Sequence, residues 1–146
     1  GRQLDEEAAR REAAANATRP SDTRPSSWSS ARRGRLFGRT DAHRELVQYA
    51  EAFARRIQLN TTMAMVAEAA AQPHTAPLVT VAIRSDGSIE SVSFVVSSGV
   101  AAIDEAITRI VHSQAPYPAF PPGLARDFDV IEIRRSWHFD MAIRLY

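Results

Sequence analysis

Apolar and polar positions repeat with two different periods along this chain, and the period separates expected strands from expected helices. Residues 78–83 are almost continuously apolar or β-branched, and residues 88–97 alternate between apolar and polar side chains. Asp86 and Gly87 lie between these runs, and glycine supplies the positive φ that such a turn requires. The pattern therefore predicts a β-hairpin over residues 78–97.

Three other segments show helical spacing. Residues 41–59 place an apolar side chain at every third or fourth position, with Asp41 as a candidate N-cap. Shorter helices are expected over residues 63–71 and 100–114, each followed closely by a proline that ends it. The apolar stripe of the helix expected over residues 41–59 consists of Leu46, Tyr49, Ala50, Phe53 and Ile57.

The C-terminal segment alternates between apolar and polar positions over residues 130–146, which is far longer than the usual strand. The pattern predicts one long strand, with Arg135 as the single charge on its apolar face. The expected fold class is α+β: a small open antiparallel three-stranded sheet in the order ββαβ, with helices packed on one face. The amphipathic helix over residues 41–59 precedes it. Tyr117 and Phe120, in a proline-rich loop, are expected to fold back over the core.

The N-terminal segment differs in composition from the rest. Residues 1–39 are rich in Ala, Arg, Pro and Ser and lack an apolar stripe, which predicts a flexible or partly helical tether before a domain over residues 40–146. Its arginines permit two interpretations, an anion-binding stripe or a solvated basic connector. No aromatic residues alternate with them to stack on bases, so no nucleic-acid partner is expected. The candidate anion-binding residues are Arg32, Arg33, Arg35 and Arg39.

Composition excludes several classes of function. The chain has 146 residues, enough for one modest core, and its formal net charge of +1 argues against general binding of polyanions. It contains no cysteine, and its four histidines are scattered without a metal-ligand spacing. It also lacks a nucleophile elbow, a phosphate-binding glycine loop and an apolar run long enough to span a membrane. We expect no enzyme activity, catalytic residue, metal or cofactor.

Several short motifs occur in an order that resembles a known family. They are the VTVAI run, the DGSI turn, the VSFVVSSG run, Ile103-Asp104 with Ala106, the prolines of residues 118–122, and the pair Trp137 and Phe139. In this order, residues 78–139 resemble the C-terminal domain of TonB-family energy transducers, including TolA-like members. The chain departs from the family pattern because it lacks a long proline-rich spacer of alternating charge. It also places an amphipathic helix directly before the domain, which is more similar to TolA.

The resemblance implies a periplasmic domain of a protein anchored in the inner membrane by a segment that precedes Gly1. Such a domain passes the energy of a proton-driven inner-membrane motor to an outer-membrane transporter or a periplasmic Tol-like protein. In this family an exposed strand accepts a partner peptide. An open sheet without catalytic groups is likewise suited to strand addition.

We expect the final strand to be the docking edge. Its partner-binding candidates are Val130, Ile131, Glu132, Ile133, Arg134, Arg135, Ser136, Trp137 and His138. The alternative class is a structural component of the cell envelope, which forms homodimers through its C-terminal strand or binds anionic polymers through the arginine-rich arm.

Overall fold

The computed structural model describes residues 31–146. The chain divides into two units, residues 1–32 and residues 33–146, and all of the described helices and strands belong to the second unit. Most of the predicted tether therefore lies outside the described residues. None of the helices in the described part is long and apolar enough to cross a membrane.

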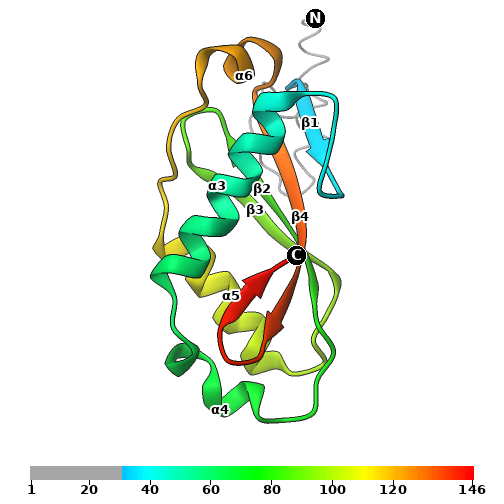
Figure 1. Ribbon diagram of the computed structural model, residues 1–146, viewed down its shortest axis with the longest axis vertical. Coiled ribbons are helices and arrows are strands. Elements are labelled where there is room, and N and C mark those ends of the chain that lie inside the picture. Colours follow the sequence, from blue (N-terminus) through cyan, green and yellow to red (C-terminus); the bar gives the residue numbers. More distant parts are fainter. Residues whose placement is uncertain (1–30) are drawn as a thin grey trace, which may run out of the picture. The chain divides into compact units, whose positions relative to one another are not determined.

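A five-stranded sheet lies at the centre of the second unit (Figure 1). Its strands are β1 (Arg33–Leu36), β2 (Leu78–Arg84), β3 (Ile89–Val96), β4 (Val130–Phe139) and β5 (Ile143–Leu145). The order across the sheet is β1-β4-β2-β3, and β5 pairs with the second half of β4. The β1–β4 pair is parallel, whereas the other pairs are antiparallel.

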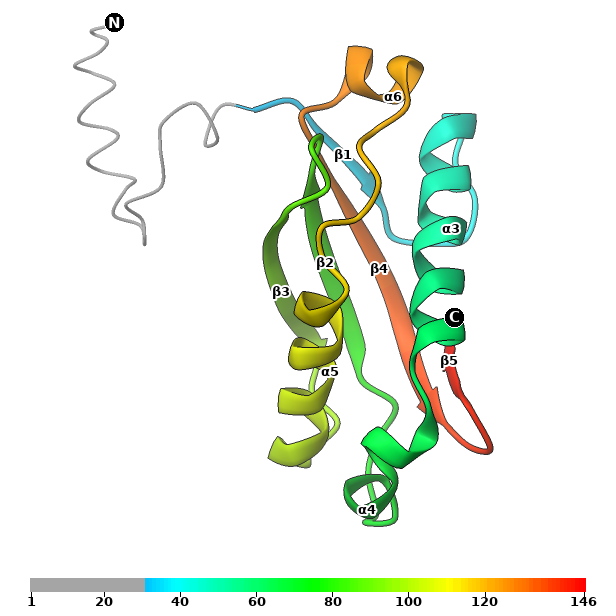
Figure 2. The same cartoon turned by 90° about the vertical axis from the view of Figure 1, so that its left-hand side faces the viewer.

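Two amphipathic helices cover one face of this sheet. Helix α3 (Arg44–Asn60) lies along β4, and α5 (Ala101–Ser113) lies along β2 and β3 (Figure 2). All five residues of the predicted stripe of α3 are buried, as are the apolar positions of α5. Shorter helical segments are η1 (Met63–Met65), α4 (Ala67–Ala70) and α6 (Pro122–Asp127). The helix predicted over residues 63–71 is thus two short pieces, and α6 was not predicted.

The predicted hairpin is confirmed, and its turn is tied to the proline-rich loop. Gly87 has a φ of +90°, and the Oδ1 atom of Asp86 accepts hydrogen bonds from the backbone and hydroxyl of Ser88. The N–H of Tyr117 donates to the carbonyl of Gly87 over 2.8 Å. Tyr117 and Phe120 are both buried, as the sequence predicts.

The C-terminal segment is a hairpin and not one long strand. β4 ends at Phe139, a tight turn covers residues 140–142, and β5 returns antiparallel to it. Phe139 pairs with Ile143 and Trp137 with Leu145, so odd-numbered residues still face odd-numbered residues across the ladder. The alternation therefore continues through the turn although the strand does not.

The start of the domain also differs from the expectation. β1 lies inside the range assigned to the tether, and Leu36 at its end is 1% exposed. Helix α3 begins at Arg44 and its N-cap is His43, whose Nδ1 accepts from the N–H of Leu46; Asp41 instead accepts from the N–H of His43. The α+β class is confirmed, while the three-stranded, purely antiparallel sheet is wrong because β1 and β5 extend it.

Candidate functional site

The outer rim of β4, the expected docking edge, is paired within the chain. Residues 33–36 of β1 lie opposite residues 130–133, and residues 143–145 of β5 lie opposite residues 137–139. The backbone groups that a partner strand would need are thus engaged along most of β4. The strand predicted to be the docking edge is therefore covered on its outer rim by β1 and β5. The same pairing uses the C-terminal strand that motivated the homodimer alternative.

Ion pairs hold β1 in this place. The Nε of Arg33 donates to Oε2 of Glu132 over 2.9 Å, and the guanidinium of Arg33 also pairs with Glu90 on β3. The hydrogen bond to Glu90 is the largest cause that raises the pKa of Arg33 above its ordinary value. Arg35 pairs with the other oxygen of Glu132 over 3.2 Å. Two of the predicted anion-binding arginines therefore already contact carboxylates of the same domain.

The remaining predicted residues of β4 point to both faces of the sheet. The Nε of Arg134 donates to Oγ1 of Thr80, and its guanidinium lies 3.6 Å from the ring centre of Phe37. Trp137 is buried in the core, whereas Ser136 and His138 share a hydrogen bond of 3.1 Å on the opposite, half-buried face. These side chains are thus engaged in contacts within the domain.

β3 is the longest strand with an unpaired rim in the described part of the chain. It pairs only with β2 and lies at the end of the strand order (Figure 2). Its surface is partly apolar, since Val95 is 50% exposed and Val96 is 43% exposed. An exposed edge with apolar side chains is the usual template for pairing with another chain.

The pairing register identifies the backbone groups on this rim. The N–H of Arg84 bonds to Ser88, toward β3, whereas the N–H of Ser85 bonds to Asp129, toward β4. Residues alternate along a strand, so Thr80 also faces β3, and its partner Ser93 faces back toward β2. The residues on either side of Ser93, Val92 and Phe94, therefore direct their N–H groups outward.

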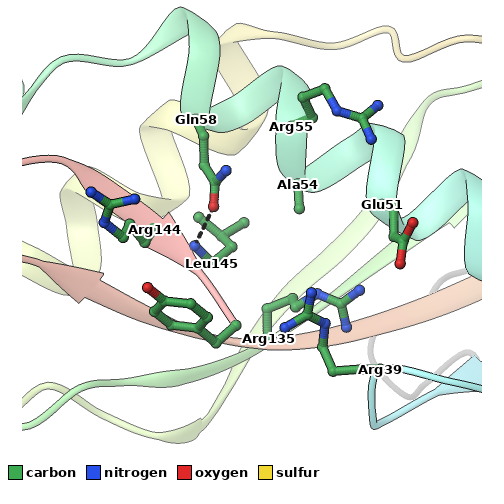
Figure 3. Close-up of a pocket in the computed structure, with 9 residues that line it drawn as sticks. Arg39, Glu51, Ala54, Arg55, Gln58, Arg135, Arg144 and Leu145 are labelled. Atoms are coloured by element: carbon green, nitrogen blue, oxygen red, sulfur yellow. Dashed lines mark hydrogen bonds between the residues drawn. The ribbon is translucent and has the colours of Figure 1, made fainter.

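A second feature is a pocket of about 370 Å³ between α3, β4, β5 and the segment after β1. Four arginines and one glutamate contribute to its wall: Arg39, Arg55, Arg135, Arg144 and Glu51 (Figure 3). Gln58 fixes the β5 side of the wall, because its Oε1 accepts from the N–H of Leu145 over 2.7 Å. The structure brings together Arg39 and Arg135, which the sequence assigned to different sites.

No group of three metal-ligating side chains occurs among the described residues. His43 is instead bonded to Asp127, Nε2 to Oδ2, over 2.8 Å, and this hydrogen bond is the main cause that lowers the pKa of Asp127. His74 and His138 each lie against an aromatic ring. These contacts are structural ones.

Sequence reasoning missed both the β3 rim and most of the pocket. The β3 rim could be found from the consecutive Val95 and Val96, which break the alternation and leave an apolar residue on the wet face. Arg55 and Arg144 carried no such signal, since exposed arginines on a helix and a strand are ordinary. Arg135 was noted as a charge on an apolar face.

Comparison with known proteins gives a match to a protein family. The family described as TonB C terminal matches residues 47–134, which is more than half of the chain. No curated protein and no solved structure matches the sequence. The matched range runs from α3 to the middle of β4 and includes the β2–β3 hairpin and α5. The chain belongs to the TonB C-terminal domain family.

Proposed function

We propose that this domain is the binding module of an inner-membrane-anchored energy transducer and takes up an extended partner segment on the outer rim of β3. Domains of its family are non-enzymatic binding domains of energy transducers and are in general periplasmic. Outer-membrane transporters and inner-membrane motor proteins are the partners that the family suggests. The membrane anchor belongs, in this proposal, to a segment N-terminal to Gly1.

The observation that carries the proposal is the unpaired rim of β3, an eight-residue strand whose pairing with β2 is regular over residues 91–94 and shifts register on either side of them. Strand addition satisfies a row of N–H and C=O groups at once, so the main chain supplies affinity and the side chains supply selectivity. Val95 and Val96 offer apolar contacts beside that row. α5 packs its buried apolar side chains into the core behind the rim, so the template is formed before the partner arrives.

The rim of β4, with the residues from Val130 to His138, remains a second candidate site for the same function. One observation favours it: β1 is only four residues long, so a partner segment that replaced it would inherit a parallel ladder to β4. The exchange would break the Arg33–Glu132 ion pair and expose Leu36. The β3 rim requires no such exchange, and we therefore place the partner there first.

Lysine substitutions on the rim of β3 test the assignment. Charged side chains on an edge discourage strand pairing, so the double variant Val95→Lys/Val96→Lys should weaken partner binding about tenfold or more, equivalent to about 1.4 kcal/mol. The probe is a set of synthetic peptides covering the periplasmic segments of a candidate outer-membrane transporter, titrated by calorimetry.

Leu59→Lys/Met141→Lys is the matched control, because it adds the same charge at two exposed apolar residues away from the rim. It should bind within about twofold of the unaltered protein, a difference of less than about 0.5 kcal/mol. Equal weakening by both double variants would show that the added charge, and not the rim, is responsible. Weakening by neither would exclude the β3 rim.

A further inference from the structure

Arg135 lines the pocket between α3, β4 and β5, where it is buried without a full set of hydrogen-bond partners. The residue is 2% exposed, and its Nη1 donates to the carbonyls of Gly38 and Arg134 over 3.0 and 3.3 Å. Its Nε and Nη2 are buried and have no hydrogen-bond partner. A buried donor without an acceptor is costly, and more so when it carries charge. Arg135, which lines the pocket, therefore has unused hydrogen-bonding capacity.

The charges around Arg135 do not compensate for it. Burial is the largest cause that lowers the pKa of Arg135, and the charge of Arg39 lowers it further, while Glu51 offsets them only in part. No ion pair joins Glu51 to an arginine of the pocket in the described part of the chain. Guanidinium groups stay protonated at neutral pH, so the side chains of the wall carry four positive charges against one negative charge. An anion bound in the pocket would balance part of this excess positive charge.

The arrangement of the arginines indicates the shape of that anion. Arg144 lies at the β5 side of the pocket, while the guanidinium groups of Arg39 and Arg135 lie near each other at the other side, below α3 (Figure 3). Ala54 and Leu145 add apolar surface between them. Positive charge is thus spread along the pocket and not focused on one point, which suits several carboxylates along an extended segment better than one compact phosphate.

We propose that the pocket lined by Arg39, Arg135 and Arg144 binds an acidic segment of a partner protein through its Asp or Glu carboxylates. Arginine forks hydrogen-bond carboxylates in a bidentate manner. Exposed side chains such as those of Arg39 and Arg144 change rotamer within picoseconds to nanoseconds. Such rotations let a carboxylate reach the buried guanidinium of Arg135. The site lies on the helix-covered side at β4 and β5, apart from the β3 rim, and does not depend on strand addition there.

Hexaglutamate is the probe for the test, with hexaglutamine as its neutral counterpart and inorganic phosphate and pyrophosphate as separate arms. In the ¹⁵N-labelled full chain, hexaglutamate should shift the Nε–Hε resonance of Arg135, and hexaglutamine should not. Arg39→Gln/Arg144→Gln should weaken the binding about tenfold, or about 1.4 kcal/mol. Arg135→Met should remove it, and the surface double variant keeps the test decisive if Arg135→Met fails to fold.

Arg44→Gln/Arg109→Gln removes the same charge at two exposed arginines that do not line the pocket and should leave the binding within about twofold. Val95→Lys/Val96→Lys should also leave it unchanged, which separates this proposal from strand addition at β3. Equal weakening by both arginine pairs would reduce the effect to net charge and overturn the proposal. Tighter binding of phosphate or pyrophosphate than of hexaglutamate at Arg135, or no shift of Arg135, would also overturn it.

Discussion

Arg33 and Glu132 form an ion pair, Nε to Oε2 at 2.9 Å, although they lie 99 positions apart in the chain. The contact joins the first described strand to the last long strand and closes the rim of β4 that would otherwise be free. It explains why an arginine from a segment that reads as a tether belongs to the folded domain. β1 is part of the structure that any partner of β4 would meet.

Leu36→Ala tests whether β1 is a structural part of the domain. Leu36 is 1% exposed in the core, so its truncation should lower the free energy of unfolding by about 2–5 kcal/mol in urea denaturation. Leu59→Ala is the control, because Leu59 is 76% exposed and its truncation should cost less than about 0.5 kcal/mol. A cost for Leu36→Ala as small as that of the control would show that β1 does not pack on the domain.

Gly87→Ala tests the contact between the hairpin turn and the proline-rich loop. Gly87 and Gly99 both have positive φ, +90° and +85°, so alanine is strained at both. Of these two glycines, only Gly87 would bring an added Cβ against another group, since the carbonyl oxygen of Tyr117 would lie 1.8 Å away. Gly87→Ala should therefore lower the melting temperature clearly more than Gly99→Ala does. Equal losses would mean that the turn and the loop separate without cost.

Ile107→Ala tests the packing of α5 against the sheet. Ile107 is fully buried in the core cluster, and we expect a loss of about 2–5 kcal/mol in the free energy of unfolding. Glu105→Ala on the exposed side of the same helix should change it by less than about 0.5 kcal/mol. A larger loss for Glu105→Ala than for Ile107→Ala would show that the opposite face of α5 packs against the sheet.

Asp104 gives the domain a dependence on acid pH. Partial burial raises the pKa of this carboxyl, but hydrogen bonds from Ser97 and Ser98 outweigh it and leave the pKa below its ordinary value. A lowered pKa in the folded state stabilises the fold above the unfolded value of about 3.9, and this stability is lost as the pH falls through the lower pKa of the folded state. Asp104→Asn should be less stable than the unaltered chain at neutral pH, and the two should converge as the pH falls through the lowered pKa of Asp104. A difference that stays constant down to pH 2 would contradict this assignment.

The sequence predicts the elements formed by local patterns and misses the pairings formed at long range. The stripe of α3 and the hairpin at Gly87 follow from residue spacing and turn chemistry, and both are confirmed. β1 contains one apolar residue that is buried, Leu36, and its parallel pairing with β4 leaves no signal in its own sequence. The turn before β5 is hidden because residue parity is preserved from Phe139 to Ile143.

The candidate sites show the same division. Which strand has a free edge depends on the strand order, and the strand order depends on where β1 and β5 pair. Sequence spacing alone therefore assigned the free edge to β4, whereas β3 lies at the end of the order. The pocket depends on α3 crossing above β4 and β5. Arg135 was the one residue of the pocket that the alternation marked as unusual, and it is the buried one.

Amide hydrogen exchange at Val92 and Phe94, with and without the partner peptide, tests strand addition most directly. Their N–H groups point outward from β3 and should exchange faster than that of Ser93 in the free domain, then become protected when a partner strand pairs with the rim. The proposal predicts this gain in protection, with the amides of residues 33–36 unchanged. Unchanged exchange at Val92 and Phe94, together with faster exchange in residues 33–36, would contradict it and show that the partner replaces β1 on β4.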